Sequence, residues 1–313
     1  MALPTKLAFV FPGQGSQAVG MARDLYQWFP EAREVFDAAS DVLGFDLSRL
    51  IFEGPEEELT RTVNAQPALL VAGVAALRAI QSKGVRPSFA AGHSVGEYAA
   101  LLSAGAMEVP EAVRLVRRRG ELMEEAATAN PGVMAAVLGL GDEEVRAAVQ
   151  EAQPAGIVDV ANYNCPGQIV ISGEFGAVEE AGRLAKELGA KRVIPLKVSG
   201  AFHSRLMSGA AQAMAAELRS AAISEPSLPV VANVTADYVR TADEVRAALG
   251  EQILGSVRWE ESVRRMAADG AEGFVEVGPG TVLAGLVGRT VKERFVTSVG
   301  DLAAVEALVR LRY

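Results

Sequence analysis

A serine flanked by glycines, in the run Gly-His-Ser-Val-Gly at 92–96, constrains the fold more than any other feature of the chain. The apolar run at 88–92 predicts a strand, and the pattern at 95–103 predicts a helix. A serine at so sharp a strand-to-helix turn needs small neighbours, because the chain folds back tightly on itself. The turn also presents the hydroxyl at the amino end of a helix, where backbone N–H groups are unpaired. Ser94 is therefore a candidate nucleophile in an α/β fold, with the N–H of Val95 placed to stabilise an oxyanion.

The chain has two histidines, and their positions decide which of them could serve as a base. A serine nucleophile needs a base, which is usually histidine. His93 adjoins Ser94 on a turn where neighbouring side chains diverge, so we interpret it as structural. His203 lies in a loop that re-enters the larger part of the predicted fold, and we expect it to be the base. For its orienting partner, Glu276 and Asp237 are two candidates, and a neutral acceptor is a third.

The order of predicted elements divides the chain into two kinds of structure. Outside 129–198, strand and helix patterns alternate, which predicts a mostly parallel sheet covered on both faces. Within 129–198 the order is β-α-β-β-α-β, the ferredoxin-like arrangement. We expect a hydrolase-like α/β catalytic domain formed by 1–128 and 199–313, with a small ferredoxin-like domain at 129–198 inserted into it. Core strands are expected at 7–11, 88–92, 230–235, 273–277 and 295–299, and helices at 67–82, 110–128, 207–221, 242–254 and 259–268.

Four arginines lie in the predicted helix at 110–128, and one of them falls on its apolar face. At about 100° per residue, Arg119 projects into the middle of the apolar stripe. Arg114 and Arg117 fall on the opposite face, where pairing with glutamates one turn away explains them. A buried guanidinium needs an anion, because burying it unpaired is costly. An internal Asp or Glu is one candidate anion, and a carboxylate on a substrate, gripped by the planar fork, is the other.

Composition excludes several classes of protein. The net charge of −9 argues against a general nucleic-acid binder, which needs a basic surface. The single cysteine, Cys165, excludes an intrachain disulfide framework and fits a reducing compartment, and two histidines disfavour a multi-His metal site. The start of the chain does not resemble a signal peptide, and no eighteen-residue apolar stretch is evident. We therefore expect a soluble cytoplasmic protein without a metal and without a membrane partner.

Six short motifs lie along the chain. They are Phe-Pro-Gly-Gln-Gly-Ser-Gln at 11–17, Gly-His-Ser-Val-Gly-Glu at 92–97, Arg-Arg-Arg-Gly at 117–120, Asn-Tyr-Asn-Cys-Pro-Gly-Gln at 162–168, Gly-Ala-Phe-His-Ser at 200–204 and Glu-Val-Gly-Pro-Gly at 276–280. Together they resemble the malonyl-CoA:acyl carrier protein transacylases of fatty-acid synthesis and the acyltransferase domains of polyketide synthases. The resemblance covers essentially the whole chain.

The resemblance implies a ping-pong reaction. Ser94, deprotonated by His203, would attack the thioester of malonyl-CoA and expel CoA. The phosphopantetheine thiol of acyl carrier protein would then take the malonyl group from the serine ester. Malonyl-CoA and acyl carrier protein are thus the implied partners, and no further cofactor is implied. Because the chain carries no other synthase domain, we expect it to serve fatty-acid synthesis.

The resemblance also implies roles for particular residues. The backbone N–H groups of Gln14 and Val95 would form the oxyanion hole, and Arg119 would bind the malonyl carboxylate. A backbone carbonyl near Gln252 would orient the histidine in place of an acid.

Selectivity and docking follow from the same resemblance. Phe202 belongs to the malonyl-selective form of its loop, and Asn162 and Asn164 match a segment that faces the cleft. An acidic carrier protein would need a basic patch on this acidic chain. Candidates for that patch are Lys186, Lys191, Arg192, Lys197, Arg114 and Arg117. A thioesterase and a catalytically silent binding module with the same fold are the two alternatives.

Overall fold

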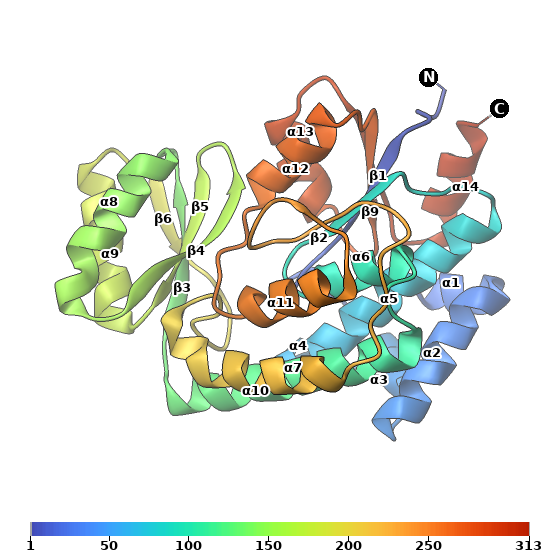
Figure 1. Ribbon diagram of the computed structural model, residues 1–313, viewed down its shortest axis with the longest axis horizontal. Coiled ribbons are helices and arrows are strands. Elements are labelled where there is room, and N and C mark those ends of the chain that lie inside the picture. Colours follow the sequence, from blue (N-terminus) through green and yellow to red (C-terminus); the bar gives the residue numbers. More distant parts are fainter. Residues whose placement is uncertain (1, 313) are drawn as a thin grey trace.

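Two β-sheets organise the computed structural model, which describes residues 2–312 (Figure 1). The larger sheet has six strands in the order β10-β9-β1-β2-β7-β8. Its first five strands are parallel, and β8 pairs antiparallel with β7 at the edge. The strands are β1 (Leu7–Phe11), β2 (Phe89–Gly92), β7 (Val230–Val231), β8 (Tyr238–Val239), β9 (Gly273–Val277) and β10 (Phe295–Val299). The expectation of a mostly parallel sheet is confirmed.

Successive side chains of β1 enter two different cores, as a strand covered on both faces requires. Phe9 and Phe11 pack into the larger core, which contains most of the buried residues of the helices on that side. Val10 packs on the other face with Trp259 and Leu283. Figure 1 shows α12 and α13 on one side of the sheet, and α5 and α7 on the other. These helices are α5 (Thr62–Ser82), α7 (Val109–Ala129), α12 (Trp259–Ala268) and α13 (Val282–Thr290).

The helix α5 lies in the middle of the larger core and contacts α7 as well as α2 (Pro30–Leu43) and α6 (Gly96–Ser103). Among the helices of residues 2–312 it is the one long and apolar enough to cross a membrane, and 89% of its most apolar window is buried inside the protein. The expectation that no eighteen-residue apolar stretch exists is therefore wrong. Its burial explains the composition, because a helix covered on all sides by other elements is apolar all round.

The smaller sheet has four antiparallel strands in the order β4-β5-β3-β6. They are β3 (Val133–Leu138), β4 (Val158–Cys165), β5 (Gln168–Gly173) and β6 (Arg192–Pro195). The helices α8 (Asp142–Ala152) and α9 (Phe175–Glu187) pack against them around a separate apolar core. Figure 1 shows this unit in green beside the larger sheet. The ferredoxin-like order is confirmed, whereas the domain boundaries at 129 and 198 stay a prediction.

Several elements differ from the expected ones. The strand expected at 230–235 is shortened to β7, because the chain turns after Val231 and Ala236 takes a left-handed conformation at φ 52°. Six helices around the larger sheet were not predicted from the sequence. They are α13 together with α1 (Arg23–Trp28), α2 (Pro30–Leu43), α3 (Leu47–Glu53), α4 (Glu56–Thr60) and α14 (Leu302–Arg310). Of the other helices, α6 (Gly96–Ser103), α10 (Ser208–Ser220) and α11 (Ala242–Gln252) lie where they were expected, with ends shifted by a few residues.

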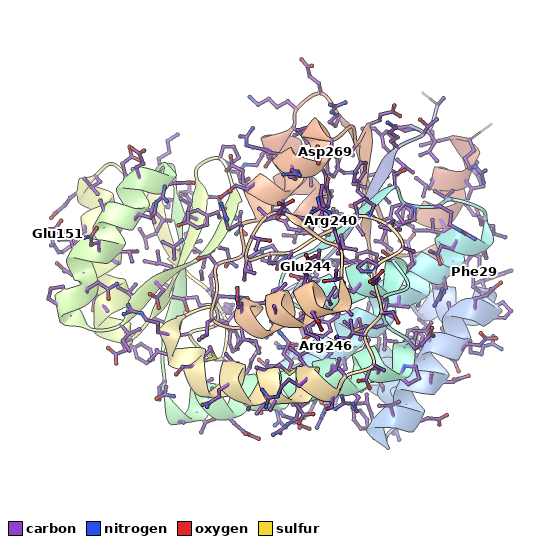
Figure 2. The ribbon with its side chains drawn as sticks, in the orientation of Figure 1. Phe29, Glu151, Arg240, Glu244, Arg246 and Asp269 are labelled. Carbon is purple, nitrogen blue, oxygen red and sulfur yellow. The ribbon has the colours of Figure 1, made fainter. Side chains whose placement is uncertain are left out.

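The helix α11 is anchored to its surroundings through its first two turns. At its start, Thr241 and Glu244 form a reciprocal capping box. Arg246 then donates to the carbonyl oxygens of Ala221 and Ile223, just beyond the end of α10. Figure 2 labels Glu244 and Arg246 on this helix. The helix ends at Gln252, whose buried side chain is hydrogen-bonded to Ser94, Glu97 and Arg119.

Candidate active site

Ser94 stands at the turn between β2 and α6 with its backbone in the left-handed region, at φ 51°. Neither neighbouring glycine could carry a side chain. A Cβ on Gly92 would lie 1.9 Å from the carbonyl carbon of Gly96, and one on Gly96 would lie 2.2 Å from the carbonyl oxygen of Phe11. The glycines are therefore required by the packing of the turn on itself and on β1. A left-handed serine in such a turn presents its hydroxyl away from the backbone, at the end of the strand.

The hydroxyl of Ser94 is hydrogen-bonded to His203, with 2.8 Å between Oγ and Nε2. The other ring nitrogen of His203 lies 2.9 Å from the carbonyl oxygen of Gln252 and 3.1 Å from that of Gly255. Because a carbonyl only accepts, Nδ1 carries the proton and Nε2 is free to accept the serine proton. Burial lowers the pKa of His203 to about 3, and the nearby charge of Arg119 acts in the same direction. The ring is therefore neutral and able to act as a base.

The two acidic candidates for orienting His203 lie elsewhere. Glu276 is fully buried, and its carboxylate accepts the backbone N–H groups of Leu283 and Ala284 at the start of α13. Asp237 is exposed and lies 3.3 Å from Arg265. The third candidate, a neutral acceptor, is the one found beside the ring.

Arg119 is 1% exposed and points into the site from α7. One of its terminal nitrogens, Nη2, lies 3.1 Å from Oγ of Ser94 and 2.9 Å from Oε1 of Gln252. The other, Nη1, donates to Oε1 of Gln66 at 2.6 Å. Within residues 2–312, Nε has no partner and no carboxylate lies within 4.0 Å of the guanidinium. Burial lowers the pKa of Arg119. The group is thus held by neutral oxygens and retains capacity for an anion beside the serine.

These groups line a cavity of about 230 Å³ between the two sheets. Gln14 and Val95 lie in its wall, and their backbone N–H groups have no hydrogen-bond partner within residues 2–312. Phe202 is 5% exposed and contributes to the apolar part of the wall. Met123, Met134, Val170, Leu196, Val198, Val282, Leu283 and Leu286 complete that apolar part. The cavity wall therefore combines backbone donors and a buried cation with apolar side chains.

Comparison with known proteins agrees with this arrangement. The model of the acyl transferase domain family matches residues 8–310. The chain belongs to the acyl transferase family. The malonyl CoA-acyl carrier protein transacylase of Bacillus subtilis (strain 168) is 47% identical, over 98% of this chain and 97% of that protein. The protein of the same name from Escherichia coli (strain K12) is 45% identical, over 98% of this chain and 100% of its own length.

Solved structures of similar proteins have the same fold. An acyl carrier protein S-malonyltransferase from Vibrio cholerae superposes with a TM-score of 0.94 at 44% identity, covering 97% of this chain and 100% of that one. A malonyl-transacylase solved in complex with a type II polyketide synthase acyl-carrier protein also gives 0.94, at 45% identity, covering 98% of this chain and 99% of that one. These matches confirm the fold class that the sequence predicts.

The segment of β4 that faces the acyl transferase cavity holds two asparagines. Oδ1 of Asn164 lies 2.9 Å from Nε2 of His93. The ring of His93 packs against that of Trp259, with 5.6 Å between the ring centroids. Burial lowers the pKa of His93, so this ring is neutral. Asn162 lines the cavity and is 6% exposed. The structure therefore gives His93 the structural contacts expected of it, and places both asparagines at the cavity.

Three residues of the site were not among the sequence candidates: Gln66, Glu97 and Asn233. Each is 1% exposed and hydrogen-bonded to another site residue. Gln66 is a lone amide near the start of the apolar run of α5, and a buried amide in such a run is a signal in itself. Glu97 stands within the quoted serine motif. Asn233 follows a short parallel strand, and side chains at that position converge on the carboxyl edge of the sheet.

The candidate docking residues fall into two groups. Arg114 lies 3.0 Å from both Glu111 and Glu217, and Arg117 lies 2.9 Å from Glu121, so both are engaged in ion pairs. The other four are exposed and make no ion pair within residues 2–312; they are Lys186, Lys191, Arg192 and Lys197. The part of the chain that the structure describes contains no cluster of three or more potential metal ligands.

Proposed function

We propose that this protein transfers a malonyl group from malonyl-CoA to the phosphopantetheine thiol of acyl carrier protein, through a malonyl ester on Ser94. The observation that carries the proposal is the position of Arg119, a buried cation 3.1 Å from Oγ of Ser94 with no carboxylate partner within residues 2–312. A lipase or simple esterase has no use for a cation there. A malonyl group, which ends in a carboxylate, supplies the missing anion.

In the first half-reaction, Oγ of Ser94 attacks the thioester carbonyl of malonyl-CoA as its proton passes to Nε2 of His203. The N–H groups of Val95 and Gln14 stabilise the oxyanion. The carbon–sulfur bond then breaks, and the CoA sulfur leaves with the proton from His203. In the second half-reaction, the carrier thiol gives its proton to His203 and attacks the serine ester. The proton returns to Ser94, so the base ends each half-reaction neutral.

The charge of Arg119 links binding to catalysis. That charge disfavours protonation of His203, which must become positive during each half-reaction. A malonyl carboxylate paired with Arg119 offsets the positive charge and eases the protonation of His203. An acetyl group leaves Arg119 uncompensated. Malonyl groups should therefore be favoured in the rate of the chemical step as well as in binding.

The proposal also covers the cellular location of the protein, its cofactor requirement, its pathway and its docking surface. The protein works in the cytoplasm, needs no cofactor beyond the phosphopantetheine of its partner, and serves fatty-acid synthesis. The carrier protein docks on four exposed basic residues that make no ion pair within residues 2–312: Lys186, Lys191, Arg192 and Lys197. Residues 1–128 and 199–313 form the catalytic domain, and residues 129–198 form the small inserted one.

Intact mass spectrometry after incubation with malonyl-, methylmalonyl- or acetyl-CoA tests the proposal. We expect a malonyl adduct that is absent from Ser94→Ala, with slower formation of the other two adducts. No adduct would indicate a catalytically silent module. Steady release of free malonate faster than transfer to carrier protein would indicate a thioesterase.

A further inference from the structure

Both peptide groups of Ser94 are held by side chains from distant parts of the chain. Its N–H donates to Oδ1 of Asn233 at 2.7 Å, and its carbonyl accepts a hydrogen bond from Nε2 of Gln252 at 3.0 Å. Asn233 also donates through Nδ2 to the carbonyl oxygen of Gly92 at 2.6 Å. The left-handed backbone of Ser94 is an unfavourable conformation for a residue with a side chain, so it persists only where surrounding contacts hold it. Asn233 and Gln252 supply such contacts from their side chains, and the backbone N–H of Glu97 also donates to the carbonyl of Ser94 at 3.0 Å.

A single carboxylate oxygen joins the two holding side chains. Oε2 of Glu97 accepts the backbone N–H of Asn233 at 3.0 Å and Nε2 of Gln252 at 2.8 Å. Glu97 lies in the first turn of α6 and is 1% exposed. No hydrogen bond of residues 2–312 connects it directly to Oγ of Ser94 or to the ring of His203. The hydrogen bonds of the Glu97 side chain therefore reach these groups through Asn233 and Gln252, and its charge also acts directly on Arg119.

The orientation of the Gln252 amide depends on what surrounds it. Its oxygen accepts from Arg119, its nitrogen donates to Glu97 and to Ser94, and its backbone carbonyl faces His203. The two ends of an amide differ little in shape, so hydrogen-bond partners decide which end faces which neighbour. A carboxylate beside the nitrogen end favours the orientation in which the oxygen faces the guanidinium.

We propose that Glu97 is a positioning residue that fixes Ser94, His203 and Arg119 through Asn233 and Gln252. The inference rests on the proposed function, because it concerns the loading of the same serine. Loss of the Glu97 carboxylate should slow loading of every acyl group, since the serine and its base both loosen. Malonyl loading should fall further than acetyl loading, since the guanidinium also loses its fixed partner.

A double-mutant cycle tests whether Glu97 acts through Gln252. Loading rates of malonyl- and acetyl-CoA are measured for the natural protein, Glu97→Ala, Gln252→Ala and the double variant. Rates are expressed per active serine, whose concentration is measured by labelling to completion with a fluorophosphonate. Misfolded protein is therefore not counted. We expect Glu97→Ala to slow malonyl loading about 30-fold in the natural background and about fivefold in the Gln252→Ala background, where Glu97 still holds Asn233.

Two further variants separate positioning from a general effect on the fold. Glu97→Gln keeps the volume and one acceptor oxygen and should recover loading to within about fivefold of the natural protein. Glu276→Gln alters another fully buried carboxylate that lies outside the cavity wall. It should lower the melting temperature and leave the malonyl-to-acetyl ratio unchanged.

The inference is overturned if the losses in the cycle are additive. It is also overturned if Glu97→Ala lowers the melting temperature but keeps the loading rate per active serine and the malonyl-to-acetyl ratio of the natural protein. Failure of the natural protein itself to form a malonyl adduct would refute the proposed function instead, and the two failures are therefore distinguishable.

Discussion

The guanidinium of Arg119 donates to the hydroxyl oxygen of Ser94 across 3.1 Å, and both residues line one cavity. Arg119 comes from α7 and Ser94 from the turn before α6, so the pair joins two elements that pack against each other. With a malonyl group on the serine, the same guanidinium would lie beside the free carboxylate. In the proposed reaction, the pair therefore relates the nucleophile to the recognition of its acyl group.

The first prediction concerns Arg119→Ala. Removing one partner of a buried charge pair typically costs about 3–5 kcal/mol, so malonyl loading should fall roughly 10²- to 10⁴-fold. Acetyl loading should fall far less, because an acetyl group has no carboxylate. Rapid-quench measurement of adduct formation gives both rates. Arg119→Lys is the matched control: it keeps the charge but lacks the planar fork, and should recover only part of the loss. Equal losses for both acyl groups would mean that Arg119 is structural.

The second prediction concerns Phe202, which is 5% exposed in the cavity wall. Replacing it by Ala should make room for the extra methyl of methylmalonyl-CoA. Because one methyl group in a pocket is worth about 1–3 kcal/mol, discrimination should relax by roughly 10- to 100-fold. Competition between the two CoA esters, followed by intact mass, measures the ratio. An unchanged ratio would remove Phe202 from selectivity.

The third prediction uses the buried carboxyl of Glu97, whose pKa is raised to about 7, mainly by burial. Between its ordinary pKa of 4.5 and about 7, the folded protein holds a proton that the unfolded chain has lost. Stability should therefore fall as pH rises through this interval, by up to about 3 kcal/mol from this group. His203, with its pKa lowered to about 3, acts in the opposite direction between about 3 and 6.5.

A comparison of natural protein with Glu97→Gln isolates the Glu97 contribution, because His203 is present in both. Urea unfolding at pH 5 and pH 8 gives the free energy of unfolding for each. From pH 5 to pH 8, the natural protein should lose more stability, or gain less, than Glu97→Gln. Identical changes in the two proteins would contradict the raised pKa.

The fourth prediction concerns docking of the carrier protein. Lys191 and Arg192 are exposed and free of ion pairs within residues 2–312. Reversing both charges to Glu should raise KM for acyl carrier protein about tenfold and leave the rate of loading from malonyl-CoA unchanged, since only the partner surface is altered. Reversal of Arg117, already paired with Glu121, is the control and should have little effect on that KM. The opposite pattern would place the docking surface on α7.

Local sequence patterns were enough to predict part of the site. The glycines around Ser94 and the place of Arg119 on the apolar face of α7 are visible within a single element, because both follow from the geometry of one turn or one helix. The shortened β7 was not visible, since the chain leaves the sheet there to bring Asn233 to the serine turn. The bond between Asn233 and Glu97 spans 136 residues of sequence. Contacts of that kind depend on how the sheet assembles, which local periodicity does not specify.

The choice of an orienting group for His203 shows the same limit. The sequence left two acids and a neutral acceptor open, because the end of α11 could not be placed relative to the histidine loop. In the structure, the capping box and Arg246 fix α11 so that the carbonyl of Gln252 lies 2.9 Å from Nδ1. Every residue has a backbone carbonyl, so the residue type at a position does not indicate which carbonyl will orient the histidine.

The most direct test of malonyl transfer through Ser94 is a single-turnover chase of the isolated malonyl-protein adduct. The adduct is mapped to its peptide, freed of CoA and mixed with carrier protein bearing phosphopantetheine, and both products are followed by mass. We predict an adduct on Ser94 that disappears as malonyl-carrier protein forms, with little free malonate. Formation of the adduct at another residue, or its loss as free malonate at the same rate with and without carrier protein, would contradict the proposal.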